Sequence, residues 1–393
     1  MTFAALASLR DGLGALARDG LLRHRRAVAS AQGPHILEQG RRLANFASND
    51  YLGLANHPEV RAAATRAIEA HGFGAGASPL VVGHSTLHDE AESAFARFVG
   101  APRALLFGSG YAANLGILAA LGDRETDIFA DRLNHACLND GAVLARANLK
   151  RYPHADLDRL AAMLAASTAR KKIIATDTVF SMDGDVADVA RLAQLAEAHD
   201  AWLVLDDAHG IGVLGGGRGT LAEWRVRSPR IICMATIGKA LGGYGAFVSA
   251  EADVIEWLLQ RARTYVFSTA LPPAMAAAAM AALEIIEREP ERAQSLHANI
   301  NAFRAGCAAA GIDTPSRTAI HPVIVGASRA AVALAQALQD RGHWVPAIRP
   351  PTVPDGTARL RVSLCAEHNR QDIDRLVADL AECLPARPEP GSG

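Results

Sequence analysis

Lysine is rare in this chain, and one lysine stands apart from the others. Of the 40 Lys and Arg side chains only four are lysines, and Lys150, Lys171 and Lys172 lie in charged runs. Lys239 instead lies in the apolar, glycine-rich stretch 231–243. A guanidinium stays protonated, whereas a desolvated ammonium can lose its proton and become a nucleophile. The pattern therefore favours a chemical role for Lys239, such as Schiff-base formation with a carbonyl compound.

Two carboxylates and an imidazole follow an apolar segment upstream of Lys239. Residues 202–206 read as a buried strand that ends in Asp206 and Asp207, and His209 follows. A carboxylate that faces a pyridine nitrogen keeps that nitrogen protonated and makes the ring an electron sink. At about 4 Å and an effective dielectric near 20, the pairing is worth roughly 4 kcal/mol. With Lys239, this strand end predicts an enzyme that uses pyridoxal phosphate.

The same Asp and His side chains also allow a metal site, because both residue types bind zinc or iron. No further cluster of His or Glu ligands accompanies them in the sequence. We therefore expect no metal, and we expect His209 to bond the phenolic oxygen of the pyridoxal ring.

Small residues and hydroxyls follow two other predicted strands and suit a phosphate. The turn 108–114 contains Gly110 and Tyr111 and precedes an apolar helix, so backbone N–H groups and the helix dipole could meet an anion there. Thr236 follows the strand that begins at residue 231. A tight turn with no ligand is the alternative for the 108–114 segment.

His135 and Ser181 also follow predicted strands. His135 could stack on a flat cofactor ring, although a histidine in front of a helix often only caps or packs. Ser181 could donate a hydrogen bond to the ring oxygen or the phosphate. Alternatively, Ser181 and Asp183 only shape the turn that ends at Gly184.

The elements that must position these residues alternate between strands and helices. Helical patterns such as 188–199 separate several short apolar runs, which we expect to be strands at 104–107, 128–130, 173–176, 202–206, 231–235 and 246–249. This alternation predicts an α/β fold with a mostly parallel sheet between helices. Such sheets bind ligands at the carboxyl ends of their strands, so the five polar turns are expected to meet at one edge.

The chain divides into four predicted parts. Residues 1–48 form a helix and a strand-like arm, and 49–285 form a large cofactor-binding domain. Residues 286–384 form a smaller C-terminal α/β domain, and the Pro/Gly-rich tail 385–393 is expected to be disordered. In the small domain we expect strands at 321–325 and 359–364 and helices at 328–341 and 371–383.

Composition excludes several classes of protein. A net charge of −1 gives no footprint for nucleic acid or for an anionic membrane. The longest apolar run, 270–283, is too short to cross a bilayer. The five cysteines are scattered without CxxC spacing, which argues against zinc and disulfides and fits a reducing cytoplasm. The basic cluster Arg23–Arg26 hints at a transit peptide, but Asp11 and Asp19 argue against import.

Several motifs together resemble one enzyme family. They are 49–54 (NDYLGL), 109–111 (SGY), 130–135 (ADRLNH), 180–184 (FSMDG), 206–210 (DDAHG) and Thr236-x-x-Lys239. The chain resembles, from about residue 49 to 380, the α-oxoamine synthases. These are fold-type I enzymes that use pyridoxal phosphate to condense an amino acid with an acyl-CoA. The resemblance implies homodimers whose active sites lie at the subunit interface.

The C-terminal domain narrows the resemblance. The stretch 347–354 (AIRPPTVP) is typical of the branch that joins L-alanine to pimeloyl-CoA or pimeloyl-acyl carrier protein and makes 8-amino-7-oxononanoate for biotin. The glycine-using ligase that makes 2-amino-3-oxobutyrate usually has an aromatic, Arg-free version there, and remains the alternative. A non-catalytic partner subunit on the same fold is a remoter one, since such a chain could lose Lys239.

The resemblance implies roles around the cofactor. Lys239 would hold it and remove the α-proton of bound L-alanine. His135 would stack on the ring and assist the thioester carbonyl, and Asp206 would pair with the ring nitrogen. His209 and Ser181 would bond the ring oxygen. The remaining cofactor contacts would come from Gly110, Tyr111 and Thr236, and from Thr269 toward the partner subunit's phosphate.

The resemblance also implies substrate contacts. Arg361 would bind the alanine carboxylate, and Arg23, Arg349 and Thr352 would meet the acyl substrate, whose far carboxylate needs a cation. One segment departs from the family pattern: a glycine-, serine- and arginine-rich loop is replaced here by 74–79 (GAGASP) and 82–84 (VGH).

Overall fold

The computed structural model describes residues 3–384 and divides the chain into two compact units. One unit is 49–297, and among the described residues the other joins 3–48 to 298–384. The division falls within helix α12 (Glu291–Ala309), after His297, whereas the sequence placed the boundary at 285. The tail 385–393 lies outside the described residues.

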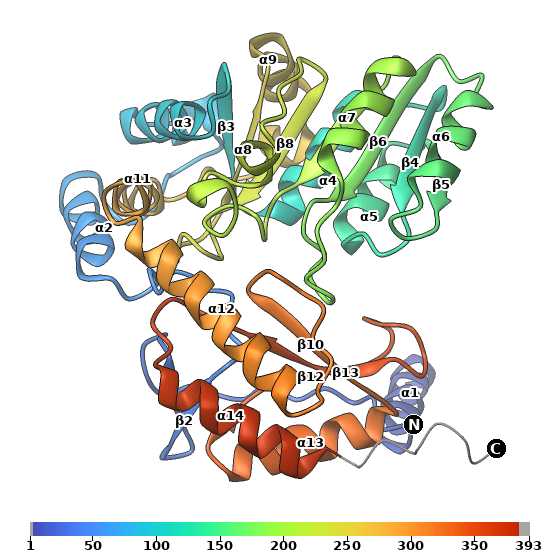
Figure 1. Ribbon diagram of the computed structural model, residues 1–393. Coiled ribbons are helices and arrows are strands. Elements are labelled where there is room, and N and C mark those ends of the chain that lie inside the picture. The colour runs from blue at the N-terminus through green and yellow to red at the C-terminus, as the bar shows by residue number, and fades with distance from the viewer. Residues whose placement is uncertain (1–2, 385–393) are drawn as a thin grey trace. The chain divides into compact units, whose positions relative to one another are not determined.

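A seven-stranded sheet forms the centre of the larger unit (Figure 1). Its strand order is β3-β9-β8-β7-β6-β4-β5, and the expected strands are present with slightly different ends. The strands are β3 (Arg103–Phe107), β4 (Thr126–Asp131), β5 (Asn148–Tyr152), β6 (Lys171–Asp177), β7 (Trp202–Asp206), β8 (Ile231–Thr236) and β9 (Ala246–Ala250). The predicted α/β fold with a mostly parallel sheet is confirmed.

Strand β9 runs antiparallel to the other strands because the connection that precedes it is short. β9 pairs antiparallel with both β8 and β3, while the pairs β4–β5, β4–β6, β6–β7 and β7–β8 are parallel. A parallel return would need a crossover of about a dozen residues or more. The connection 237–245 is too short for one, and this connection carries Lys239.

The two helical regions that the sequence predicted here are present. Val189–Ala198 (α7) matches the predicted 188–199, and the long helical region is interrupted at Pro290 as expected. The others are α2 (Pro58–His71), the π-turn η1 (Pro79–Gly83), α3 (Thr86–Val99), α4 (Gly110–Leu121), α5 (Ala136–Leu144), α6 (Leu157–Ala165), the 3₁₀ turn η2 (Gly215–Gly217), α8 (Thr220–Trp224), α9 (Ala252–Arg261), α10 (Arg263–Val266) and α11 (Pro273–Arg288).

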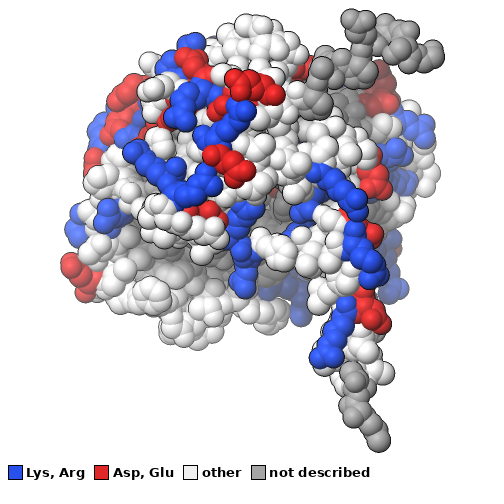
Figure 2. All heavy atoms as spheres, turned by 90° about the horizontal axis from the view of Figure 1, so that it is seen from below, with Lys and Arg blue, Asp and Glu red and all other residues white. Residues whose placement is uncertain are grey.

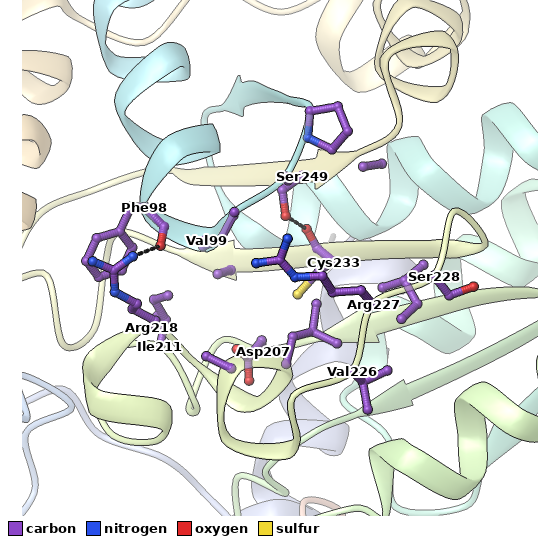
Figure 3. A pocket seen from close by; sticks show the side chains of 18 of the residues that line it. Phe98, Val99, Asp207, Ile211, Arg218, Val226, Arg227, Ser228, Cys233 and Ser249 are labelled. Atoms are coloured by element: carbon purple, nitrogen blue, oxygen red, sulfur yellow. Dashed lines mark hydrogen bonds between the residues drawn. The ribbon is translucent and has the colours of Figure 1, made fainter.

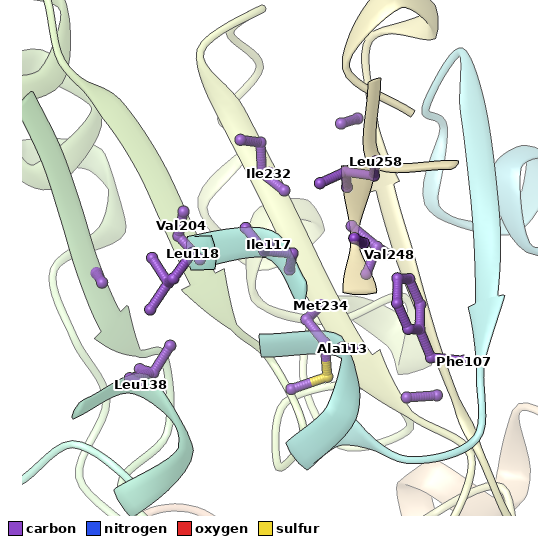
Figure 4. Close-up of a cluster of buried hydrophobic side chains, with 14 of the residues drawn as sticks. Phe107, Ala113, Ile117, Leu118, Leu138, Val204, Ile232, Met234, Val248 and Leu258 are labelled. Atoms are coloured by element: carbon purple, nitrogen blue, oxygen red, sulfur yellow. The ribbon is translucent and has the colours of Figure 1, made fainter. Parts of the chain in front are cut away.

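One hydrophobic core of this unit lies between the sheet and α4, α5 and α9, and a second lies between the sheet and α6 and α7. α4 is apolar on nearly all sides, and its Ile117 and Leu118 are fully buried against alternate residues of the strands, such as Ile232 and Val248 (Figure 4). Burying such side chains stabilises the fold by roughly 1.5–3 kcal/mol each. This packing fixes the start of α4 beside the strand ends.

The second unit is smaller and contains two three-stranded sheets, β1-β2-β11 and β10-β13-β12. α13 and α14 pack against each other beside β10 and β13 (Figure 1), and no residue of α1 is buried. Besides the larger part of α12, its elements are α1 (Ala4–Arg18), β1 (His35–Glu38), β2 (Arg41–Asn45), β10 (Ile320–Gly326), α13 (Ser328–Asp340), β11 (His343–Trp344), β12 (Ala347–Ile348), β13 (Ala358–Ser363) and α14 (Arg370–Cys383).

Charge is mixed over the surface, as the near-neutral composition implies. On the face that Figure 2 shows, acidic side chains lie among the basic ones. No helix between residues 3 and 384 is long and apolar enough to cross a membrane.

Candidate active site

Lys239 lies in a loop that the β8–β9 turn holds closed. The amide of Ile237 donates to the carbonyl of Gly245 (2.9 Å), and the amide of Gly243 donates to the carbonyl of Ile237 (2.9 Å). Ile237, Ala240 and Leu241 are fully buried and anchor the loop, while Lys239 itself is half-buried. The expected buried surroundings are therefore present, and the amine projects from them.

Gly242 makes this loop possible. Its φ is +68°, and a Cβ there would lie 2.2 Å from the backbone nitrogen of Ala55. Backbone atoms cannot yield as a flexible side chain could. We expect Gly242→Ala to lower the free energy of unfolding by about 2–4 kcal/mol in urea titrations. Gly74→Ala is the matched control, because Gly74 has open space around it and an ordinary φ; equal effects of both changes would contradict the prediction.

Lys239, His209 and Tyr51 form a short chain of hydrogen-bonded side chains. Lys239 Nζ lies 2.7 Å from His209 Nε2, and the Tyr51 hydroxyl lies 2.7 Å from His209 Nδ1. Tyr51 donates its own proton to Asn49 Oδ1 (3.2 Å), so it accepts from Nδ1–H. His209 Nε2 is then the acceptor that faces the amine. Tyr51 is fully buried and fixes this orientation.

The two adjacent aspartates have different surroundings. The Asp207 carboxylate accepts from the hydroxyls of Thr178 and Thr220 and from the amide of Thr220 (2.9 Å). These bonds tie Asp207 to the turn below the strand end. Burial raises the pKa of Asp207 to about 6.

Asp206 accepts instead from the amide of Ala208 (3.0 Å) and from Asn114 Nδ2 (2.7 Å). Asn114 lies on α4, so the packing of that helix positions the carboxylate. Within the described residues, Asn114 Oδ1 is buried and has no hydrogen-bond partner. Asp206 is therefore held by the Asn114 side chain and the Ala208 backbone amide. Its carboxylate oxygens can accept further hydrogen bonds, for example from a cationic partner.

A chain of side chains joins Asp206 to His135. Asn114 Nδ2 also contacts Cys137 Sγ (3.1 Å), and Cys137 Sγ lies 2.9 Å from His135 Nδ1. Burial raises the pKa of the Cys137 thiol, which stays protonated. His135 Nδ1 also accepts from the amide of Cys137 (3.4 Å), so in the neutral ring the proton lies on Nε2.

The surroundings of His135 favour its neutral ring over the charged one. Partial desolvation lowers its pKa, although solvent still reaches the side chain. Its backbone N–H donates to Asp177 Oδ2 (2.6 Å). His135 also caps α5 through Nδ1, as the alternative interpretation of the sequence expected. Its Nε2 atom remains available for a ligand.

Gly110 and Tyr111 begin α4, as the strand–turn–helix pattern predicted. A Cβ on Gly110 would lie 3.3 Å from Met234 Sδ, so glycine allows the helix to start close to the sheet. The Tyr111 ring meets His135 edge-on with centroids 6.4 Å apart, and its hydroxyl donates to Asp140, which raises the pKa of Tyr111. The structure thus brings Tyr111 and His135 together.

The other predicted cofactor residues lie in turns. The Thr236 hydroxyl donates to the carbonyl of Gly245 (3.0 Å) and accepts from the amide of Gly238 (3.1 Å), so it already shapes the Lys239 loop. Ser181 lies in the half-buried turn before Gly184, where the φ of +70° favours glycine. Thr269 is exposed in the segment before α11.

Sequence reasoning assigned no role to Tyr51, Asn114, Cys137 or Asp177. Two of them stood in the quoted motifs: Tyr51 in 49–54 and Asn114 in the turn 108–114. Asp177 ends β6 next to Asp206 in register, and burial followed by that neighbouring charge raises its pKa well above normal. Polar residues at adjacent strand ends were the available signal.

The predicted substrate residues belong to the smaller unit and form two local arrangements. Arg23 donates to the Thr352 hydroxyl (3.2 Å), and Arg349 donates to the carbonyl of Gly20. The segment after α1 and the 349–352 turn are thereby joined, although they are far apart in sequence. Arg361 is buried on β13, where it donates to Ser363 Oγ (2.9 Å).

Comparison with known proteins places these features in a family. The sequence profile of the family "Aminotransferase class I and II" matches residues 41–380. The chain is similar to an 8-amino-7-oxononanoate synthase of Azoarcus sp. (strain BH72), with 52% identity over 96% of this chain and 97% of the relative.

Two solved structures are similar to the chain over most of its length. A serine palmitoyltransferase of S. paucimobilis that carries a pyridoxal phosphate adduct superposes with a TM-score of 0.90 at 28% identity, covering 97% of each chain. An 8-amino-7-oxononanoate synthase of Francisella tularensis superposes with a TM-score of 0.76 at 30% identity, covering 86% of this chain and 97% of the other.

Proposed function

The chain belongs to the class I and II aminotransferase family and is a pyridoxal phosphate-dependent enzyme, and from this premise we propose that it condenses L-alanine with a pimeloyl thioester. The products would be 8-amino-7-oxononanoate, carbon dioxide and free CoA or carrier protein. The relatives at about half identity that bear this product in their names support the choice of substrates. The reaction would serve biotin biosynthesis.

The observation that carries the proposal is the Lys239 amine facing His209 beside the Asp206 strand end. When bound, pyridoxal phosphate supplies an electron sink for the pair of electrons left by α-proton removal. The donor set fits that group: Lys239 for the aldehyde, Asp206 for the ring nitrogen, His209 and Ser181 for the ring oxygen. The start of α4 at Gly110 and Tyr111, with Thr236 and Thr269, suits the phosphate.

Two side chains would move protons in this reaction. Lys239, once released by the amino acid, would take the α-proton of L-alanine as the general base. His135 would present Nε2–H to the thioester carbonyl oxygen, where a hydrogen bond stabilises developing negative charge. Its lowered pKa supports this assignment, because a neutral ring with Nδ1 occupied by Cys137 can only donate from Nε2.

The arginines of the smaller unit would select the substrates. Arg361 would bind the carboxylate of L-alanine, since guanidinium and carboxylate form paired hydrogen bonds. The Arg23–Thr352 contact and Arg349 support a second cationic subsite for the far carboxylate of the pimeloyl chain. An acyl group of the same length without a far carboxylate could not form this ion pair.

The substrate assignment is tested by CoA release across amino acids and acyl thioesters. We expect L-alanine with pimeloyl-CoA to give kcat/KM at least about tenfold above glycine with acetyl-CoA, because one matched carboxylate contact is worth ~1.4 kcal/mol or more. Heptanoyl-CoA is the matched control, because its acyl chain has the same seven carbons without the far carboxylate. A higher rate with glycine and acetyl-CoA would instead identify the enzyme as a 2-amino-3-oxobutyrate-forming ligase.

Homodimerisation is part of the proposal. Leu80, Val81 and Val82 of η1 are 49–74% exposed, and clusters of exposed apolar side chains often mark protein contacts. α1 carries a further exposed apolar row that includes Leu9 and Leu13. We also place the enzyme in the cytoplasm, in keeping with its five free cysteines.

A further inference from the structure

A cavity of about 590 Å³ lies in the larger unit, on the face of β8 and β9 that points away from α4 (Figure 3). Alternate residues of β8, such as Cys233, line it, while Ile232 and Met234 point to the opposite face and pack in the core. The loop after α3, α8 and the loop 225–229 form its walls. Its size is in the range of cavities that hold small organic ligands.

The floor and walls of the cavity are mostly apolar with a few polar groups. Leu221 and Val226 contribute partly exposed apolar side chains, and the nearly buried Phe247 and Ile231 also line the cavity. The buried hydroxyl of Ser249 donates to the carbonyl of Cys233 (3.3 Å). A ligand with a hydrocarbon body would therefore displace water from apolar walls, which favours binding.

Positive charge dominates the rim. Three arginines line it, and Arg218 is already paired with Glu287 (2.9 Å). Arg225 and Arg227 form no ion pair or hydrogen bond through their side chains with any residue that the structure describes. The Arg227 guanidinium extends across the cavity toward Gly100 (Figure 3).

The acidic groups at the cavity do not cancel both arginines. Asp207 is engaged by Thr178 and Thr220, and Glu251 lies at the start of α9. The cavity therefore has two arginines without an acidic partner among the described residues, Arg225 and Arg227, and one exposed carboxylate, that of Glu251. The excess of positive charge beside apolar walls selects an anion with a hydrocarbon body.

We propose that this cavity is a second binding site, distinct from the catalytic one, for a small carboxylic acid with an apolar body. Its carboxylate pairs with Arg227 and Arg225, and its hydrocarbon part lies over Leu221 and Val226. In the described part of the chain, none of the predicted catalytic, cofactor or substrate residues lines the cavity. The inference is independent of which substrates the enzyme condenses.

The test uses the enzyme loaded with pyridoxal phosphate and two probes of equal shape, 4-phenylbutanoate and its neutral amide. Ligand-observed NMR titration measures the dissociation constant of each. We expect the acid to bind with a Kd on the order of 1 mM, as its size allows, and the amide at least about tenfold more weakly.

Two variants locate the probe. Arg227→Gln removes the charge and keeps the length, and we expect it to raise the Kd of the acid at least about tenfold. Ala222→Trp, at an exposed position of the α8 wall, blocks the space and should abolish binding of both probes. Arg170→Gln, at an exposed arginine away from the cavity, should leave the Kd unchanged. Thermal melts confirm that each variant is folded.

Every other outcome contradicts the proposal. Equal binding of acid and amide would exclude an anion site. Binding that survives both Arg227→Gln and Ala222→Trp would place the probe elsewhere, such as at the acyl subsite. No binding of either probe to the folded enzyme at 10-fold the expected Kd (about 10 mM) would show that the cavity is not a ligand site.

Discussion

Replacing Lys239 by alanine should abolish turnover and leave the fold intact. The amine is both the attachment point of the cofactor and the proposed general base, so kcat is expected to fall by about 10⁴-fold or more. Borohydride treatment, which fixes an imine as a stable amine, should no longer attach the cofactor to the protein. Steady-state rates and peptide mapping after borohydride treatment measure the two effects.

The fold should tolerate this change because Lys239 is only half-buried and its neighbours Ile237 and Leu241 anchor the loop without it. We expect the free energy of unfolding to change by about 1 kcal/mol or less. Lys172→Ala is the matched control: this lysine donates to the carbonyl of His199 (3.3 Å) and should keep full activity. Substantial turnover by the Lys239→Ala enzyme would remove the proposed role.

The sequence was informative where chemistry and strand ends coincide. β7 ends at Asp206, as predicted, and β8 carries Thr236 and the Lys239 loop at the same edge. Parallel pairing of β6, β7 and β8 brings their carboxyl ends together, so residues far apart in the chain become neighbours. The contact between Lys239 and His209 follows from that register.

The sequence was less informative where tertiary contacts decide. β5 was not predicted, because NLKRY has no apolar run; it is an edge strand whose Lys150 pairs with Asp127 (2.6 Å). The roles of Tyr51 and Asn114 depend on distances across the fold that no local pattern contains. The boundary after His297 lies inside a continuous helix, which has no linker signal in its composition.

Substitutions of Asp206 and Asp207 should separate an effect on turnover from an effect on stability. We expect Asp206→Asn to lower kcat by about 10³-fold, because the variant loses the roughly 4 kcal/mol that keeps the ring nitrogen protonated. The amide should fit without unfolding. Its oxygen can still accept from Ala208, and the unpartnered Asn114 Oδ1 becomes an acceptor for its NH₂ group once the Asn114 amide rotates.

Asp207→Asn should show the opposite behaviour, with turnover within about tenfold of the parent enzyme but a changed pH dependence of stability. Burial raises the pKa of Asp207 to about 6, against about 3.9 in an unfolded chain. As pH rises from about 4 to 6, the unfolded chain loses this proton first, so the contribution of Asp207 to stability falls by about 3 kcal/mol. The amide does not titrate. Urea titrations at pH 4 and pH 6.5 should therefore show Asp207→Asn gaining stability relative to the parent by about this amount. A loss of turnover in both variants would mean that the pair acts as one unit.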